Sequence, residues 1–168
     1  MEFPQRGTQV EIEEGKQFMP NFGDAGLIPC ITQDWQTHEV LMLGWMNRGA
    51  LATTLETGLA YYYSRARRTL WKKGELSGQA QIVKRILIDD DQDCLLIEVE
   101  LTGGASCHVG YRSCFFRALE WQPGDTNFFL GFLETKKIYN PQTAYDAQGC
   151  ASVAGGRMPG ATGGTDHE

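Results

Sequence analysis

The sequence lacks the features that would place it in a membrane or on nucleic acid. None of its segments approaches the run of about 18 apolar residues that a membrane-spanning helix needs. Its net charge is −6 at pH 7, whereas general nucleic-acid binding normally shows as a basic surface. The first residues, Met1–Arg6, contain neither a basic segment nor an apolar one, so no secretory signal is expected. We therefore expect a cytoplasmic protein without membrane or nucleic-acid partners.

The length and the composition indicate one folded domain with two less structured ends. A chain of 168 residues suggests a single domain. Residues 1–25 read as a polar, irregular N-terminal extension, and residues 26–146 contain the patterned segments. Glycine supplies six of the last 22 residues, so we expect residues 147–168 to form a flexible tail.

The apolar pattern predicts a sheet-rich α+β fold with mostly antiparallel strands and few short helices. Asn47 is a candidate N-cap and Gly58 a candidate stop for one helix over 48–57. The expected strands are Leu27–Thr32, Val40–Met46, Leu59–Ser64, Gln81–Ile88, Cys94–Leu101, Ser113–Trp121 and Phe128–Thr135.

Three alternating carboxylates indicate a site for a hard cation. Asp89, Asp91 and Asp93 point to the same side if the segment is extended, where they repel unless a cation lies among them. Hard cations prefer such oxygen ligands. A solvated acidic turn is the simpler alternative, but apolar strand residues flank the segment on both sides and favour the metal.

Nearby cysteines indicate a second, softer metal site, and the two sites together favour a two-metal catalytic centre. Cys107 and Cys114 lie seven residues apart with Gly110 between them, so a tight turn could bring both thiolates to one zinc ion. Cys94 is the natural third ligand, and three ligands leave a position open for water whose pKa zinc lowers to about 7. Three unligated strand cysteines are the alternative. His108 is a candidate general base, proton shuttle or supporting group.

A basic stretch over residues 61–78 indicates a site for a phosphorylated ligand. It contains five cationic residues among aromatics, serines and glycines, in a chain that is acidic as a whole. Arg, Lys and Ser side chains suit phosphate, and aromatic rings suit the face of a base or sugar. A solvated basic loop and a single-stranded nucleic-acid site are the alternatives. The acidic remainder of the chain favours a small phosphorylated ligand.

Several motifs, in this order, resemble those of phosphoribosyl-AMP cyclohydrolases. The resemblance covers roughly residues 26–145, and several ordered motifs are far more specific than any single one. The motifs are Leu27–Pro29, Val40–Leu43, Met46–Arg48, Ser64–Arg67, Leu70–Gly78, Asp89–Asp93, Cys107–Cys114, Tyr139–Pro141 and Ala144–Tyr145.

The resemblance implies an enzyme of the third step of histidine biosynthesis. Its members hydrolyse the N1–C6 bond of the adenine ring in 1-(5-phosphoribosyl)-AMP, which yields the formimino-carboxamide ribonucleotide. It also implies an intertwined homodimer that uses zinc and magnesium, with zinc ligands from both subunits. Within this framework His108 handles the proton that N1 receives, magnesium at the three aspartates offsets phosphate charge, and Arg65, Lys73 and Ser77 contact the substrate.

One position departs from the family pattern. Many members carry a zinc-binding cysteine between the first two aspartates, where this chain has Asp90, and Cys94 follows four residues later. Either Cys94 or Asp90 then completes the zinc site, and the two thiolates already present favour a third. The family often adds a helical pyrophosphohydrolase domain, which is not expected here because about 23 residues follow Tyr145.

Two other functions are compatible with the same residues. A zinc-dependent hydrolase or deaminase that acts on another purine nucleotide would use the same pocket chemistry. A metal-binding or regulatory protein without turnover would keep the fold alone. The presence of His108 and of the whole 65–77 stretch argues against the second alternative.

Overall fold

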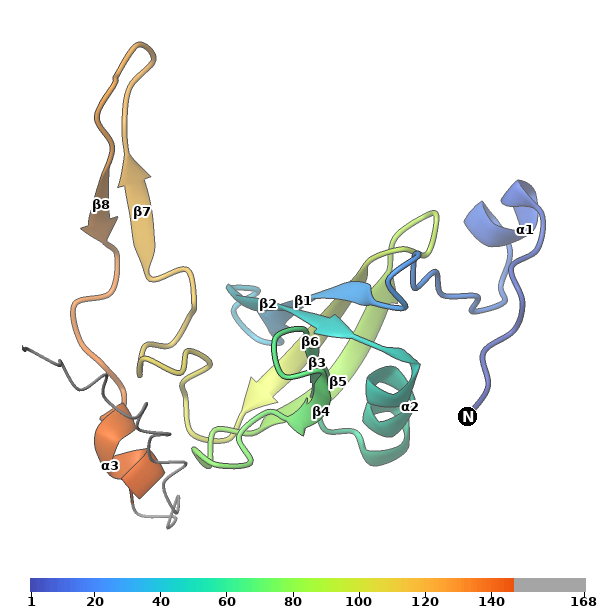
Figure 1. Cartoon of the computed structure of the whole chain (residues 1–168), viewed down its shortest axis with the longest axis horizontal. Coiled ribbons are helices and arrows are strands. Elements are labelled where there is room, and N and C mark those ends of the chain that lie inside the picture. Colours follow the sequence, from blue (N-terminus) through green and yellow to red (C-terminus); the bar gives the residue numbers. More distant parts are fainter. Residues whose placement is uncertain (147–168) are drawn as a thin grey trace, which may run out of the picture.

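A four-stranded sheet forms the centre of the protein. The structure, a computed structural model, describes residues 1–146, so the expected tail at 147–168 lies outside the described residues. The sheet has the order β2–β1–β6–β5, in which β1 and β6 run parallel and the other neighbours run antiparallel (Figure 1). Its strands are β1 (Ile28–Asp34), β2 (Val40–Met46), β5 (Gln81–Ile88) and β6 (Leu95–Leu101). The prediction of a sheet-rich, mostly antiparallel α+β fold is confirmed.

Two hairpins and three short helices complete the described chain. The hairpins are β3–β4 (Tyr61–Ser64 and Thr69–Lys72) and β7–β8 (Arg117–Glu120 and Phe129–Phe132), and the helices are α1 (Gln9–Glu13), α2 (Arg48–Thr57) and α3 (Pro141–Asp146). The β7–β8 hairpin projects at one end of the molecule, and α1 lies at the other (Figure 1). Within residues 1–146, no helix has the length and apolar character needed to cross a membrane.

Helix α2 has the limits that its capping residues predict. The Asn47 side chain accepts a hydrogen bond of 2.8 Å from the backbone N–H of Ala50, which satisfies one of the free donors at the helix start. Gly58 ends the helix with a φ of 69°, a left-handed conformation that favours glycine. Ala50, Leu51 and Thr54 form the buried face. Local chemistry therefore sets both ends, and packing against the sheet stabilises the short helix.

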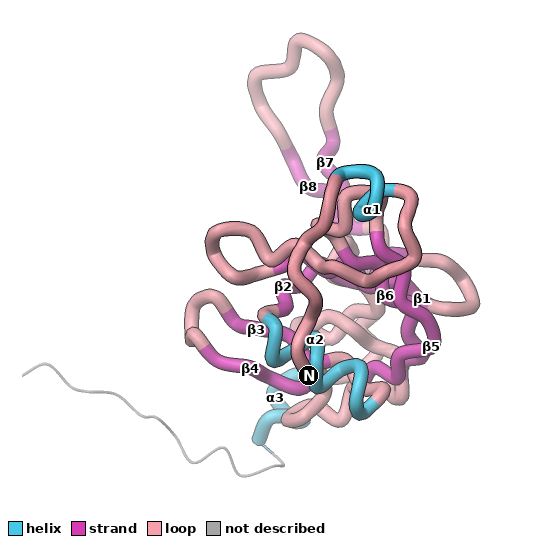
Figure 2. The backbone as a smooth tube through the Cα atoms, turned by 90° about the vertical axis from the view of Figure 1, so that its right-hand side faces the viewer, coloured by secondary structure: helices cyan, strands magenta, loops and turns pink. Residues whose placement is uncertain are grey.

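Two segments that looked irregular in the sequence have regular structure. Within residues 1–22, Thr8 and Glu11 form a capping box that starts α1, a helix too short to show an apolar period. Within the basic stretch, Thr69–Lys72 forms β4 because it pairs with β3 across a four-residue turn. The two strands expected over 113–121 and 128–135 are shorter, since only β7 and β8 pair. Figure 2 shows the long loops that surround these elements.

A hydrogen-bonded tyrosine lies in the middle of the core. The Tyr62 side chain is fully buried among the apolar residues of the sheet and α2. Its hydroxyl lies 2.7 Å from Thr32 Oγ1 and donates a 2.7 Å hydrogen bond to Gln81 Oε1. Gln81 Nε2 in turn donates to Ser106 Oγ at 3.0 Å. This polar chain links β1, β3, β5 and the loop after β6, and every member has a partner, as burial requires.

Replacing the Tyr62 hydroxyl should destabilise the fold more than replacing a neighbouring one. Tyr62→Phe leaves buried groups of Thr32 and Gln81 without their partner, so the free energy of unfolding should fall by about 1–3 kcal/mol. Tyr63→Phe, on the same strand but partly exposed, should change it by less than about 0.5 kcal/mol. Urea denaturation measures both values, and equal effects would contradict the role of the network.

Candidate active site

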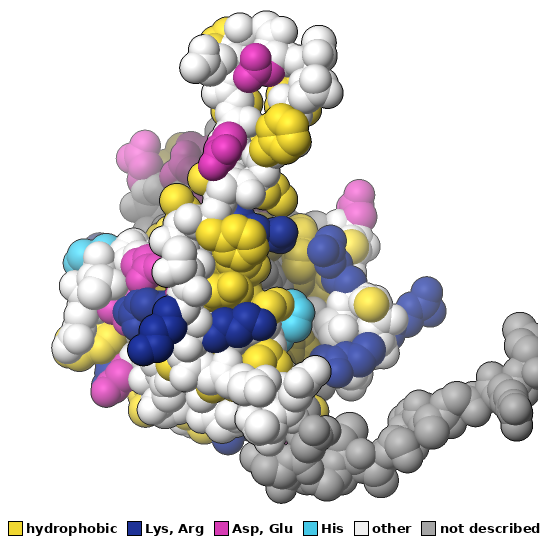
Figure 3. Space-filling view, turned by 90° about the vertical axis from the view of Figure 1, so that its left-hand side faces the viewer, with side chains coloured by type: hydrophobic (Ala, Val, Ile, Leu, Met, Phe, Trp, Pro, Cys, Tyr) yellow, Lys and Arg dark blue, Asp and Glu magenta, His cyan; other side chains and the backbone are white. Residues whose placement is uncertain are grey.

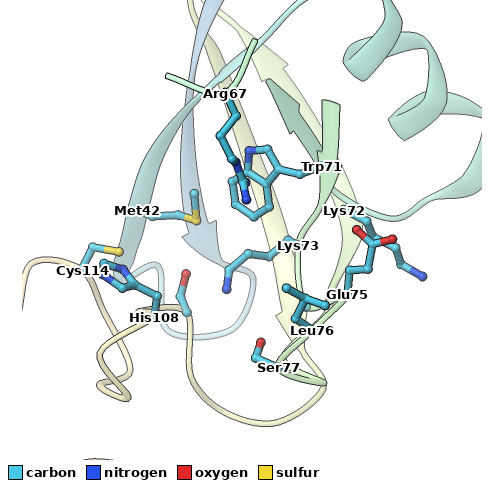
Figure 4. Close-up of a pocket in the computed structure, with 12 residues that line it drawn as sticks. Met42, Arg67, Trp71, Lys72, Lys73, Glu75, Leu76, Ser77, His108 and Cys114 are labelled. Atoms are coloured by element: carbon cyan, nitrogen blue, oxygen red, sulfur yellow. The ribbon is translucent and has the colours of Figure 1, made fainter. Parts of the chain in front are cut away.

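A pocket opens where the β3–β4 hairpin faces the loop after β6. Its volume is about 520 Å³, within the range of small-ligand sites. Figure 4 shows Lys73 extending across it toward His108 and Cys114, with Arg67 and Trp71 on one side and Ser77 on the other. The lining residues are Met42, Arg67, Trp71, Lys72, Lys73, Gly74, Glu75, Leu76, Ser77, Ser106, His108 and Cys114.

A tight turn over Cys107–Gly110 places Cys107 near Cys114, which lines the pocket. Gly110 closes the turn by donating to the Cys107 carbonyl at 3.0 Å, with a φ of 102°. A Cβ atom at this position would come within 2.3 Å of the Tyr139 carbonyl oxygen. Both the backbone conformation and the available space therefore require glycine here.

An ion-pair network fastens this loop to the central sheet. The Arg112 guanidinium donates to Asp34 Oδ2 at 2.8 Å and to Glu39 Oε2 at 2.7 Å. The Ser113 hydroxyl donates to the carbonyl of Val40 at 2.8 Å, and the Cys114 N–H donates to that of Leu41 at 2.7 Å. The charged pairs lie at the β1–β2 turn, so the sheet fixes the position of the loop that carries the two thiols.

Lysine and cysteine alter each other's protonation inside the pocket. Burial lowers the pKa of Lys73, which is 7 % exposed, against the opposing effect of Cys114 and Cys107. Although Cys114 is an exposed residue, desolvation of its sulfur and the neighbouring Cys107 raise its pKa to about 12, and Lys73 opposes this rise. The free Cys114 thiol is thus protonated at neutral pH, and a metal ion would displace its proton on binding.

The acidic cluster forms a separate group on the loop between β5 and β6. Asp89, Asp91 and Asp93 are exposed and present potential ligand atoms within 4.8 Å of one another. Partial desolvation and the charges of Asp91 and Asp89 raise the pKa of Asp93. A raised pKa is the expected effect of repulsion between neighbouring carboxylates. This is the one such group of three among residues 1–146, so a single chain does not bring Cys94 together with Cys107 and Cys114.

Cys94 and Asp90 both lie beside the acidic cluster. Cys94 immediately precedes β6, and desolvation together with the charges of Asp89, Asp93 and Asp91 raises the pKa of its thiol. Asp90 lines a cavity of about 300 Å³ between this loop and the N-terminal segment. The choice between these two residues as third zinc ligand therefore stays a prediction.

The pocket contains most of the predicted substrate-binding and catalytic residues. Lys73, Ser77 and His108 all line it. Arg65 instead lies with its guanidinium carbon 4.9 Å from the centre of the Trp45 ring. Sequence reasoning did not single out Arg67 or Trp71, which line the pocket in its place, although both belong to the same basic and aromatic stretch. In a turn between two strands, which of two nearby arginines faces the pocket depends on the hairpin geometry.

The fold and the pocket define a class of protein, an α+β protein whose pocket is lined by cationic side chains and is large enough for a small molecule. The family model for phosphoribosyl-AMP cyclohydrolase matches residues 42–116. The phosphoribosyl-AMP cyclohydrolase of Methanothrix thermoacetophila is 50% identical over 82% of this chain and 97% of its own length. That of Caulobacter sp. is 50% identical over 73% and 90%, and that of Desulforapulum autotrophicum is 51% identical over 71% and 91%. The chain therefore belongs to the phosphoribosyl-AMP cyclohydrolase family.

The buried carboxylate of the ion-pair network should make stability depend on acid pH. Burial alone would raise the pKa of Asp34, but hydrogen bonds from Thr37 and Gln36 and the charge of Arg112 leave it below its ordinary value. The folded state thus favours the ionised form of Asp34. The stability that this carboxylate contributes is complete above about pH 4 and is lost as pH falls through its pKa in the folded protein. Asp34→Asn should lower stability at pH 7 by about 1.5–3 kcal/mol.

Chemical denaturation from pH 7 to pH 2 tests this assignment. The free energy of unfolding of the wild type should fall below about pH 4 more steeply than that of Asp34→Asn. Asp24→Asn, at an exposed acidic residue, is the matched control and should follow the wild type. Parallel curves for the wild type and Asp34→Asn would show that this carboxylate does not supply the acid-sensitive stability.

Proposed function

We propose that the protein hydrolyses the N1–C6 bond of the adenine ring of 1-(5-phosphoribosyl)-AMP, the third step of histidine biosynthesis, as its family membership indicates. The observation that carries the proposal is the shared pocket of about 520 Å³, into which two distant family motifs, at 70–78 and 107–114, direct their side chains. The product is the formimino-carboxamide ribonucleotide.

The walls of the pocket suit a nucleotide that carries phosphate. Arg67, Lys72 and Lys73 supply positive charge, and the Ser77 hydroxyl adds a neutral donor. The Trp71 ring stacks on the buried Tyr62 ring with centroids 5.1 Å apart, which fixes its orientation. Trp71 therefore offers a rigid aromatic surface against which the purine can lie. Arg65, whose guanidinium lies over the Trp45 ring, is two residues from the pocket residue Arg67, which supports a role for Arg65 in phosphate contact at the rim.

The thiols and the imidazole supply the chemistry. The Cys107–Cys114 pair is a fitting donor set for zinc, which when bound supplies Lewis-acid activation of water for attack on C6. His108 is exposed at the same pocket and can transfer the proton that N1 receives as its bond to C6 breaks. Lys73 binds and orients the substrate. The three aspartates, with carboxylates close together and exposed, fit a hard cation such as magnesium.

An apolar arm supports the proposal of an intertwined homodimer. Large side chains on the β7–β8 hairpin and its flanks are exposed, although a hairpin of two strands is marginal alone in water. Figure 3 shows apolar side chains continuing from this hairpin to the body below it, with Lys and Arg alongside. The exposed residues are Phe115, Leu119, Trp121, Phe128, Phe129, Leu130, Phe132, Leu133 and Ile138. A second copy of the chain would bury this surface and bring Cys94 of one subunit to the thiol pair of the other.

Turnover measurements test the reaction. Purified protein supplied with zinc and magnesium should open the ring of phosphoribosyl-AMP and leave AMP and adenosine unchanged. His108→Ala should lower kcat by about 100-fold or more while zinc content is retained, because the proton transfer is lost and the thiols remain. His38→Ala, at an exposed turn histidine, is the control. Absence of ring opening by the metal-loaded wild type would refute the proposed reaction.

A mixing experiment tests the shared zinc site separately. Cys94→Ala and Cys107→Ala proteins should each lose zinc, whereas Cys30→Ala, at a buried core cysteine, should keep it. When the first two variants are coexpressed, about half of the dimers contain one subunit of each kind. Each mixed dimer keeps one intact zinc site of its two, so about a quarter of the wild-type zinc content and activity should return. No recovery would contradict sharing between subunits. If Cys94→Ala keeps its zinc, the same experiment is done with Asp90→Ala. Loss of zinc in Asp90→Ala and its recovery on coexpression with Cys107→Ala would identify Asp90 as the ligand.

A further inference from the structure

The N-terminal segment contacts the acidic loop closely, although neither the fold class nor the proposed reaction requires it. We infer that residues 1–22, here called the N-terminal clasp, fix the shape of the Asp89–Asp93 loop, and that Gln92 is the positioning residue that sets its affinity for a divalent cation. The inference rests on the proposed magnesium site. It assigns to the clasp, which precedes the part of the chain matched by the family model, a role in metal binding.

The clasp is packed on the core. Phe22 is 4 % exposed and Met19 is 2 % exposed. The Phe3 ring lies 5.9 Å from the Phe18 ring and 5.7 Å from the Phe22 ring, centre to centre. The Arg48 guanidinium, at the start of α2, lies over the Phe22 ring at 4.8 Å. These contacts give the clasp a fixed position from which it can constrain another segment.

Gln92 connects the loop to the clasp with both ends of its amide. Its Oε1 accepts a hydrogen bond of 2.6 Å from the Met19 N–H, and its Nε2 donates to the carbonyls of Ile12 at 2.9 Å and Gln17 at 3.2 Å. Its own carbonyl accepts from the Asn21 N–H at 2.7 Å. The residue is 5 % exposed, and these partners lie more than 70 positions earlier in the chain. Such a fully bonded buried amide strongly specifies one arrangement.

The buried glutamine determines where the carboxylates point. Gln92 has a φ of 57°, a left-handed turn conformation that is uncommon for a residue other than glycine. Asp91 and Asp93, on either side of it, are exposed while Gln92 is buried. Asp89 Oδ1 accepts from the N–H groups of Asp93 at 3.0 Å and Cys94 at 2.9 Å, which closes the loop. Burial of one side chain thus leaves three carboxylates together on the solvent side.

A cationic side chain adds a second tie between the clasp and the loop. The Arg6 guanidinium donates to the Met19 carbonyl at 3.0 Å and to the Asp91 carbonyl at 2.8 Å, so it bridges the two segments. Without these ties, the mutual repulsion of the carboxylates would favour their separation. A preformed loop binds a cation more tightly because less ordering accompanies binding, as supporting groups around metal ligands generally show.

Mn²⁺ binding by the zinc-loaded, full-length protein, followed by electron paramagnetic resonance in place of Mg²⁺, tests the inference. Gln92→Asn keeps an amide and a residue type that tolerates positive φ, but it is too short to reach the clasp. It should weaken Mn²⁺ binding by about tenfold or more. It should also speed amide hydrogen exchange of Asp93 and Cys94 in the protein without Mn²⁺. Gln17→Ala, which keeps the accepting backbone carbonyl, should behave as the wild type in both measurements.

Two further variants separate the possible results. Tyr62→Phe destabilises the fold away from the loop and should leave Mn²⁺ affinity unchanged, whereas Asp91→Asn removes a ligand and should abolish tight binding. Wild-type affinity in Gln92→Asn alongside the loss in Asp91→Asn would overturn the role of the clasp and leave the cation site standing. Absence of Mn²⁺ binding by the wild type would overturn the clasp and the cation site together, while turnover would still decide the proposed reaction independently.

Discussion

The buried hydroxyl of Tyr62 is the interaction on which the position of the pocket depends. It connects Thr32 in the central sheet to Gln81, which in turn binds Ser106 at the pocket wall. The Tyr62 ring makes a second, apolar contact with the pocket, because it stacks on the ring of Trp71, another lining residue. Loss of a partner inside a core of low dielectric is costly, so the network has one stable arrangement. The pocket therefore shares the rigidity of the core.

Positive and negative side chains are concentrated in different parts of the molecule. Cationic side chains and the Cys114 thiol line the pocket, whereas three exposed carboxylates lie together on the loop between β5 and β6. Each of these two groups is unfavourable alone, because like charges repel one another. The apolar side chains of the β7–β8 hairpin are also unfavourable where they are exposed to water. Anionic substrate, metal ions and a second subunit would each relieve one of these costs. The features that carry these costs are thus those that the proposed reaction and the proposed dimer use.

Local signals in the sequence predicted the elements whose causes are local. Asn47 and Gly58 set the ends of α2, and the apolar pattern located five of the six sheet and hairpin strands before residue 102. Strand β4 was missed because its residues form a strand through pairing with β3, and α1 because a capping box creates a helix of five residues without an apolar period. The parallel partnership of β1 with β6 was not predictable, since strand patterns do not specify their partners.

The sequence by itself determined the chemistry of this protein: which thiols, carboxylates, cations and imidazole are present, and in what order. The tertiary structure decided which of them meet. Lys73, Ser77 and His108 share a pocket, while Arg65 stacks on Trp45 and Arg67 enters instead. It also showed that residues 1–22 pack and bind Gln92 rather than form an irregular extension. The physical reason is that residue types and spacings act over a few positions, whereas pockets and clasps join segments that are tens of residues apart.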